Sequence, residues 1–273
     1  MARIDPTLLP VVVDLEHGLR ELGVPFGIVG ALVPELLLDA RPARMTNDAD
    51  AMVVVQTLAE FESLKEQLRA YGFERTRVPH RLRHASGGVL DLLPYSESIA
   101  PGDRLQFDAD TVLNMAGCRH VVPRAVSVAI EGGPSLPVAP LPLYALLKFI
   151  AFSDRRAPKD LGSVFHCLEH YLEDDERRYG VEYGGAGVPY EYTCAHLLGL
   201  DARPLLDDAI SQTVASVLAR FDGPDALLVD VAAAERGRAF VDDELRAHVF
   251  ELFRWYRRGL GIAELIESRR AGV

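Results

Sequence analysis

The stretch that decides the fold is Phe26-Gly-Ile-Val-Gly-Ala31, followed after a helix-length gap by Arg44-Met-Thr-Asn-Asp-Ala-Asp-Ala-Met-Val-Val-Val55. Alternate residues of a β-strand face the same side of a sheet, so Asp48 and Asp50 project together. The apolar run after Asp50 indicates a buried strand, and carboxylates at its start call for a cationic partner. An Asp-x-Asp pair alone is also common on solvated strand ends, but two carboxylates so placed can bind a hard divalent cation.

A third carboxylate, Asp91, lies within the apolar run Val89-Leu-Asp-Leu-Leu93. An acidic residue in such a strand needs a cation beside it. That cation is either a nearby arginine or a metal ion shared with Asp48 and Asp50. Gly30 stands at a strand-to-helix turn, where the backbone can approach a ligand closely, although a glycine at a turn is as often purely structural.

Apolar periodicity and capping signals predict an α/β domain, with a mixed sheet and flanking helices, in the N-terminal half of the chain. Asp5 is the expected N-cap of the first helix, with Pro6 in its first turn. Thr57 and Glu60 have the spacing of a capping box, and Gly72 should end that helix. The predicted helices are residues 5–22, 30–39 and 58–71, and the predicted strands are 26–29, 49–55, 81–84, 89–93 and 125–130.

Residues 131–142 are rich in glycine and proline, which is typical of a linker. We therefore expect two domains, an α/β domain over residues 1–135 and a helical domain over residues 136–273. Lys148 and Arg155 lie two helical turns apart and should share one helix face. Lys159 follows Pro158 and begins the next helix. Residues 173–203 read as an irregular surface segment in preference to a substrate-facing loop.

The composition describes an ordinary globular protein of 273 residues with a formal net charge of −11 and 49% hydrophobic residues. That charge disfavours a surface that tracks a nucleic-acid backbone along its whole length, although it permits a local basic cleft. No stretch of eighteen apolar residues and no signal peptide is evident, so we expect a cytoplasmic protein without membrane contact. The three cysteines, Cys118, Cys167 and Cys194, are widely spaced and are expected to be buried apolar residues.

A basic run lies between the carboxylate pair and Asp91. It has two interpretations of about equal weight, a phosphate-facing cleft or a solvated hairpin edge whose charges oppose aggregation. Its members are Arg75, Arg77, His80, Arg81, Arg83 and His84.

These motifs together resemble the nucleotidyltransferase superfamily that includes DNA polymerase β, and more narrowly its bacterial AbiEii-type branch, several of whose members are toxins of toxin/antitoxin pairs. The family pattern is a Gly-[Gly/Ser] turn, then Arg-x-[Thr/Ser]-x-Asp-x-Asp with an apolar central residue, then a third acid on a later strand. Here Gly30-Ala31 matches the turn, although alanine lacks the second glycine or the serine hydroxyl. The remaining matches are Arg44, Thr46, Asp48, Asp50, Asp91, Lys148, Asp154-Arg155 and Lys159-Asp160.

The resemblance, which covers residues 24 to 172, implies transfer of NMP from an NTP to an acceptor hydroxyl. It implies two Mg²⁺ ions, with Mn²⁺ as a substitute, held by Asp48, Asp50 and Asp91. It also implies nucleotide contacts by Gly30, Ala31, Arg44, Thr46, Lys148, Arg155 and Lys159. The acceptor is a tRNA or a protein, with a cognate antitoxin as partner, or alternatively a small molecule such as an antibiotic. A catalytically inactive relative that binds a nucleotide or a partner is the remaining alternative.

Overall fold

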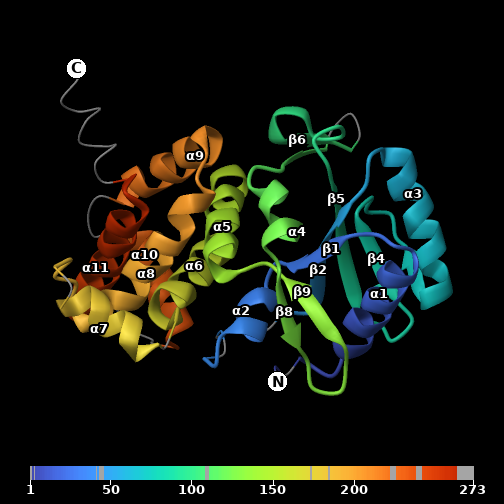
Figure 1. Ribbon diagram of the computed structural model, residues 1–273. Helices are drawn as coiled ribbons and strands as arrows, with labels where there is room; N and C mark the ends of the chain where they lie inside the picture. Colours follow the sequence, from blue (N-terminus) through green and yellow to red (C-terminus); the bar gives the residue numbers. More distant parts are fainter. Residues whose placement is uncertain are drawn as a thin grey trace. The chain divides into compact units, whose positions relative to one another are not determined.

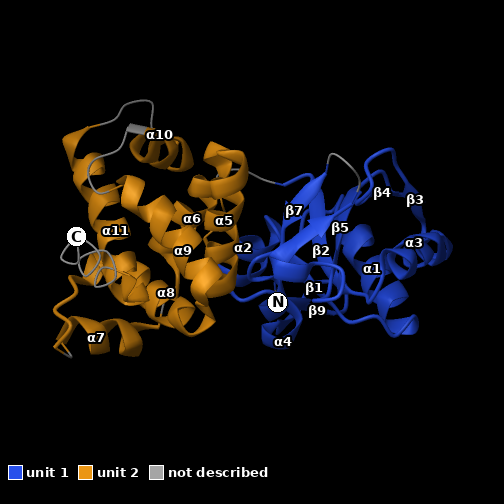
Figure 2. Cartoon of the chain, turned by 90° about the horizontal axis from the view of Figure 1, so that it is seen from above, with its two compact units in different colours: residues 1–39, 45–140 blue, residues 40–44, 141–273 orange. Residues whose placement is uncertain are grey.

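The computed structural model describes residues 2, 4–40, 42, 46–107, 111–172, 174–183, 185–221, 226–237 and 242–262. Arg44 lies outside the described residues, so its predicted nucleotide contact stays a prediction. The chain divides into two compact units (Figure 2). Unit 1 comprises Met1–Asp39 and Met45–Pro140, and unit 2 comprises Ala40–Arg44 and Leu141–Val273.

Unit 1 is built on a mixed sheet of seven strands in the order β3-β4-β5-β2-β1-β9-β8, which confirms the predicted α/β class. Its central strand β2 runs antiparallel to β1 and parallel to β5, and β1 runs parallel to β9. A separate two-stranded sheet joins β6 to β7. The strands are β1 Phe26–Val29, β2 Asp48–Val54, β3 Phe73–Arg75, β4 Arg81–His84, β5 Val89–Tyr95, β6 Arg104–Gln106, β7 Val112–Asn114, β8 Val126–Ala129 and β9 Ser135–Val138.

Helices flank this sheet on both sides, with α1 and α3 on one side and α4 on the other (Figure 1). Close packing of these helices on the sheet requires glycine at two positions. A Cβ on Gly27 in β1 would lie 2.8 Å from Val121 Cγ1 of α4, and one on Gly88 would lie 2.4 Å from Val11 Cγ2 of α1. The helices of unit 1 are α1 Leu9–Glu21, α2 Leu32–Leu37, α3 Leu58–Gln67 and α4 Val121–Arg124.

Thr57 is the N-cap of α3, as predicted, while the Glu60 side chain reaches the backbone of Gln56, one residue before the N-cap. Thr57 Oγ1 accepts a hydrogen bond from the Glu60 backbone N–H at 3.0 Å, and Glu60 Oε2 accepts one from the Gln56 N–H at 2.6 Å. Beyond a 3₁₀ turn, Gly72 ends the segment with a φ of 86°, in the left-handed conformation that glycine adopts without strain.

The start of the first helix differs from the prediction. Helix α1 begins at Leu9, with Pro10 in its first turn, and Asp5 is not its N-cap. The Asp5 carboxylate instead accepts hydrogen bonds from the N–H and hydroxyl of Thr7. A short polar side chain can hydrogen-bond the backbone of a local turn instead of capping a helix. The Asp5 side chain does so in a turn that precedes α1.

Unit 2 is helical (Figure 1). Its core is aromatic and aliphatic: Phe149 in α5 stacks on Tyr256 in α11 with ring centroids 5.7 Å apart, and both side chains are buried. Helices α8 and α11 cross closely at Gly199 and Gly259, because a Cβ on either would clash with the backbone of the other helix. The helices are α5 Leu141–Arg155, α6 Pro158–His170, α7 Asp175–Tyr183, α8 Thr193–Ala202, α9 Asp208–Leu218, α10 Ala226–Glu235 and α11 Asp243–Leu260.

The glycine- and proline-rich segment 131–142 is more structured than a linker. It contains β9, which pairs with β1 and β8, so a boundary between residues 135 and 136 falls inside a strand. The division into compact units comes after Pro140 instead. None of the helices in the described part of the chain combines the length and the apolar character needed to cross a membrane.

Candidate functional site

The carboxylates of Asp48, Asp50 and Asp91 lie on neighbouring strands of unit 1. Strands β2 and β5 are parallel, and Asp50 pairs directly with Asp91 in their register. Residues in register on adjacent strands face the same side of the sheet, and Asp48 precedes Asp50 by one full repeat of the strand. Asp48 and Asp50 therefore share one face, as predicted, and Asp91, far from them in the sequence, lies on the same face.

Gly30 lies directly against Asp50. It follows β1, in which Val29 pairs with Asp50, and its φ is 70°. A Cβ built on Gly30 would lie 1.9 Å from Asp50 Oδ2, far inside contact distance. Only glycine therefore fits both the backbone conformation and the space beside this carboxylate. Ala31 follows as the residue that precedes α2.

A guanidinium stands beside the acids. Arg81 in β4, which pairs with Asp91 in register, donates from Nε to Asp91 Oδ1 and from Nη2 to Asp91 Oδ2, both at 2.7 Å. The same Nη2 lies 3.7 Å from Asp48 Oδ2. These hydrogen bonds and the charge of Asp91 raise the pKa of Arg81, with smaller contributions from Asp48 and Asp50. One arginine is thus shared between two of the three carboxylates.

Thr46 holds the Asp48 carboxylate through contacts within its own segment. Its hydroxyl lies 2.7 Å from Asp48 Oδ1 and 3.0 Å from the Asp48 carbonyl oxygen, and its N–H donates to Glu35 Oε1 at 3.4 Å. These contacts orient the segment that carries Asp48, and the nucleotide contact predicted for Thr46 stays a prediction.

The donor set suits a hard divalent cation, because carboxylate oxygens are the ligands that Mg²⁺ and Mn²⁺ prefer. Three carboxylates and the guanidinium of Arg81 stand together on this face of the sheet. The side chain of Asp48 is 40% exposed and that of Asp91 is 13% exposed. Within the described residues, no group of three or more acidic, histidine or cysteine side chains is close enough to hold one ion as it stands. Asp48 and Asp50 therefore fit a cation by their chemistry and common face, while Asp91 is engaged by Arg81.

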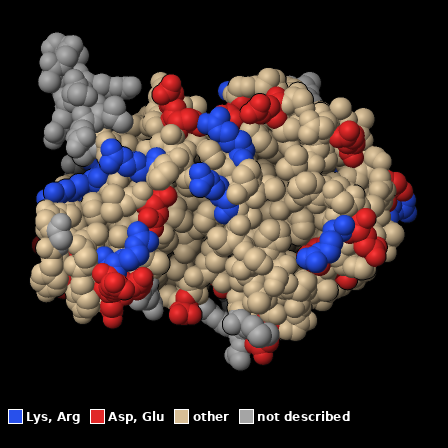
Figure 3. Space-filling model, viewed as in Figure 1, with Lys and Arg blue, Asp and Glu red and all other residues tan. Residues whose placement is uncertain are grey.

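The basic run of the sequence does not form one continuous cleft. Arg75 pairs with Glu62, Arg81 with Asp91, and His84 with Asp14 at 3.1 Å. On the face in Figure 3, Lys and Arg stand in several small groups, some of them beside Asp or Glu. Three of the six members thus form ion pairs, and Arg81 is the member that reaches the carboxylates of the candidate site. From the sequence, any of several nearby arginines could pair with Asp91, so Arg81 could not be identified as its partner in advance.

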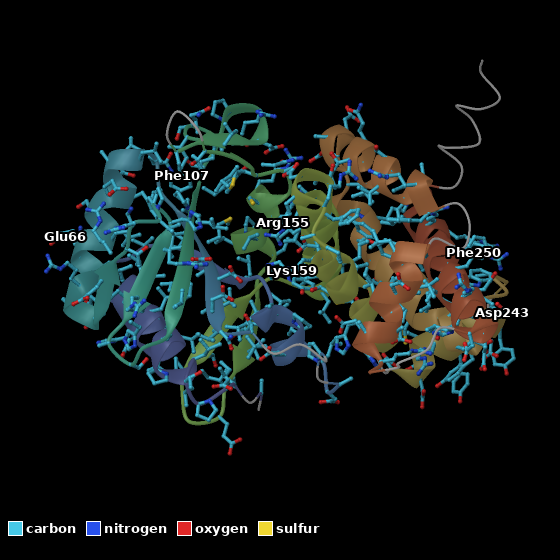
Figure 4. All side chains as sticks on the ribbon, turned by 180° about the vertical axis from the view of Figure 1, so that it is seen from behind. Glu66, Phe107, Arg155, Lys159, Asp243 and Phe250 are labelled. Carbon is cyan, nitrogen blue, oxygen red and sulfur yellow. The ribbon has the colours of Figure 1, made fainter. Side chains whose placement is uncertain are left out.

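Lys148 and Arg155 meet in unit 2, as their spacing on one helix face predicts. Their common partner is Asp160, whose side chain is fully buried in the first turn of α6. Arg155 Nε donates to Asp160 Oδ2 at 2.7 Å, and Lys148 Nζ lies 3.5 Å from Oδ1. Arg155 ends α5 and Lys159 is exposed at the start of α6 (Figure 4). The nucleotide contacts predicted for Lys148, Arg155 and Lys159 stay predictions.

The cysteines take no part in the candidate site. Cys118, Cys167 and Cys194 are all buried and free of disulfide bonds, as predicted. Burial raises the pKa of the Cys118 and Cys167 thiols to about 12, so both remain protonated and unreactive at neutral pH.

Comparison with known proteins leaves the family open. No protein-family model and no curated protein matches the chain. Among solved structures, the antibiotic-resistance factor ANT(2'')-Ia has a solution structure with 14% sequence identity, covering 80% of this chain and 95% of that chain at a TM-score of 0.35. A likeness this weak does not establish a shared fold. The resemblance to nucleotidyltransferases therefore depends on the motif residues and their arrangement.

Proposed function

We propose that the protein is a divalent-cation-dependent nucleotidyltransferase that moves NMP from an NTP to an acceptor hydroxyl. The observation that carries this proposal is the register of Asp50 with Asp91 on adjacent parallel strands, beside a glycine whose Cβ position the Asp50 carboxylate fills. Carboxylates gathered on one face of a sheet offer the oxygen ligands that a hard divalent cation prefers.

In this proposal Asp48 and Asp50 hold the metal, with Mg²⁺ or Mn²⁺ as the ion. When bound, the metal neutralises phosphate charge and lowers the pKa of the acceptor hydroxyl. Thr46 keeps the Asp48 carboxylate in place through its hydroxyl. The Gly30-Ala31 backbone is the proposed contact for a phosphate group, because backbone N–H groups at such a strand-to-helix turn can donate to phosphate oxygens.

Arg81 positions Asp91 in the proposed site. Its two parallel hydrogen bonds hold the Asp91 carboxylate in a fixed plane on the face that carries Asp50. From there Asp91 can accept a hydrogen bond from the acceptor hydroxyl or join the metal ligands. In either role, we propose that Asp91 serves the acceptor substrate. Its strand β5 is separated from β1, which Gly30 follows, by β2, the strand of Asp50.

A second candidate function is a non-catalytic module, and the Arg81–Asp91 pair favours it. If Arg81 alone neutralises these acids, the site is structural and does not respond to metal. The two proposals differ in metal dependence. A nucleotidyltransferase transfers label with Mg²⁺ or Mn²⁺ and loses this activity with a chelator, whereas the module transfers none under either metal.

The test is incubation of the full chain with each α-labelled NTP and Mg²⁺ in cell lysate, followed by separation of RNA, protein and small molecules. We expect label in one fraction, which identifies the acceptor class and decides between a macromolecular, toxin-type acceptor and a small molecule. Asp48→Asn and Asp50→Asn should abolish transfer, a loss of at least about a thousandfold. Asp39→Asn, a matched change at an exposed acid outside the site, should retain it. Equal transfer by all three variants contradicts the proposal.

A further inference from the structure

A row of exposed tyrosines lies on unit 2. Tyr183 is 78% exposed and Tyr179 is 48% exposed, and both belong to α7, which lies at the margin of the unit (Figure 1). Their ring centroids are 6.2 Å apart, and the ring of Tyr190, in the 3₁₀ turn Tyr190–Tyr192, stacks on Tyr179 at 5.3 Å. Single exposed apolar side chains are ordinary, whereas aromatic side chains gathered at one place are typical of interaction surfaces.

Polar contacts hold this row in place, because none of the nine residues of α7 is buried. Arg177 forms two hydrogen bonds with Asp201 in α8, both at 2.9 Å. The Tyr190 hydroxyl donates to Asp175 Oδ1 at 2.8 Å and so ties the 3₁₀ turn to α7. The tyrosines are therefore ordered before a partner arrives, which lowers the entropic cost of binding to them.

The row already holds one guanidinium of its own chain. The guanidinium carbon of Arg178 lies 3.9 Å from the centre of the Tyr190 ring, and Arg178 Nε donates to Thr193 Oγ1 at 2.9 Å. A guanidinium over an aromatic face gains both cation–π attraction and flat stacking contact. Tyr179 and Tyr183 offer the same chemistry at greater exposure.

The surroundings of the row are acidic. Among the described residues from 174 to 192, five are acidic and two are arginines, and both arginines already have partners within unit 2. A nucleic acid would offer bases to the tyrosines, but its phosphates need surplus Lys and Arg beside them. A cationic peptide matches both the rings and the charge. The acids are Asp174, Asp175, Glu176, Glu182 and Glu191.

We propose that the tyrosine row binds an arginine-bearing peptide segment of a partner protein. Arginines of the partner stack on Tyr179 and Tyr183, as Arg178 lies over Tyr190, while the surrounding carboxylates attract the positive charge of the segment. The surface lies entirely within unit 2, and the inference does not depend on the proposed nucleotidyl transfer.

The test is fluorescence anisotropy of a labelled peptide of alternating glycine and arginine, titrated with the full chain at physiological ionic strength. The comparison ligands are the same peptide with lysine in place of arginine and an oligouridine of similar length. We expect the arginine peptide to bind more tightly than either, because only the guanidinium combines positive charge with a flat surface that stacks on tyrosine.

Variants separate the rings from the general charge. Tyr183→Ser should weaken binding of the arginine peptide about two- to fivefold, and Tyr183→Phe, which keeps the ring, should restore it. Val126→Ser, at a 40% exposed apolar side chain of unit 1, should bind as the wild type does. Glu176→Gln should weaken binding about twofold, whereas Glu97→Gln, which removes the same charge from an exposed position in unit 1, should leave it unchanged.

Equal binding by Tyr183→Ser and the wild type overturns the inference, and so does an equal loss in Val126→Ser. Tighter binding of the oligouridine than of the arginine peptide overturns it as well, because the tyrosines would then serve bases. Equal binding of the lysine and arginine peptides would show that charge alone recruits the ligand and would contradict stacking on the row.

Discussion

Two constraints require glycine at position 30: its left-handed backbone conformation and the lack of space beside Asp50. Mutation can separate their effects. Gly30→Ala introduces a left-handed alanine and a Cβ that clashes with Asp50, whereas Gly87→Ala introduces a left-handed alanine with nothing within 4 Å. We expect Gly87→Ala to lower the free energy of unfolding by about 1 kcal/mol and Gly30→Ala to lower it by roughly 2–4 kcal/mol. Urea denaturation of both variants measures the difference. Equal losses would show that Asp50 does not fill the Gly30 site.

Asp160 is a buried carboxylate whose cationic partners become evident only in the folded chain. Its carboxylate has no exposed surface and is shared by Lys148 and Arg155. Asp160→Asn should lower the free energy of unfolding by roughly 3–5 kcal/mol, because it leaves the ammonium of Lys148, whose side chain is only 14% exposed, without its anion. Asp154→Asn, at an exposed acid in α5, the helix that carries Lys148 and Arg155, should change it by less than about 0.5 kcal/mol. A small loss in Asp160→Asn, measured by urea denaturation, would refute the pairing.

Residue spacing predicted part of the candidate site. The period of two along β2 placed Asp48 and Asp50 on one face, and the apolar context of Asp91 indicated that it needs a cation. The register that sets Asp50 beside Asp91 depends on strand pairing, which the sequence does not encode locally. The selection of Arg81 for Asp91 and of Asp160 for Lys148 depends on tertiary packing, so neither pair could be read from the sequence.

At the scale of elements, the strongest local signals gave the most accurate boundaries. Residues 26–29 form β1 as predicted, and α3 begins at Leu58 after its N-cap Thr57. The strands β3, β6 and β7 were not predicted, because three residues carry too little periodicity, and the four-residue strand β9 was not predicted either. β9 lies in a glycine- and proline-rich segment, where turn chemistry concealed a strand that pairing with β1 stabilises.

The N-cap of α3 can be tested directly. Thr57→Ala removes the oxygen that accepts the Glu60 N–H and should cost about 1 kcal/mol of unfolding free energy. Thr57→Ser keeps the oxygen and should recover most of this loss. The shift in urea midpoint at constant slope reports both effects. An identical loss in the two variants would assign it to the methyl group instead.

At the scale of the whole molecule, buried histidines should make the protein sensitive to mild acid. Burial lowers the pKa values of His80, His166 and His196 below that of an exposed histidine. Between the lowered pKa and the unfolded value of about 6.5, the unfolded chain binds more protons, so stability rises with pH and is lost as pH falls. His166→Gln should therefore lose less stability than the wild type between pH 7.5 and 5.5, measured by urea midpoints. A larger loss of stability in His166→Gln than in the wild type would contradict a lowered pKa of His166.

The most direct test of the account is Mn²⁺ binding followed by electron paramagnetic resonance, in the presence of a non-hydrolysable NTP analogue. We predict that the wild type and Asp39→Asn bind Mn²⁺ alike. Asp48→Asn and Asp50→Asn should each bind it at least about tenfold more weakly, because a metal ligand matters at least as much as the groups that orient it. Equal binding by all four proteins, or no Mn²⁺ binding by the wild type, would contradict the claim that these carboxylates form a divalent-cation site.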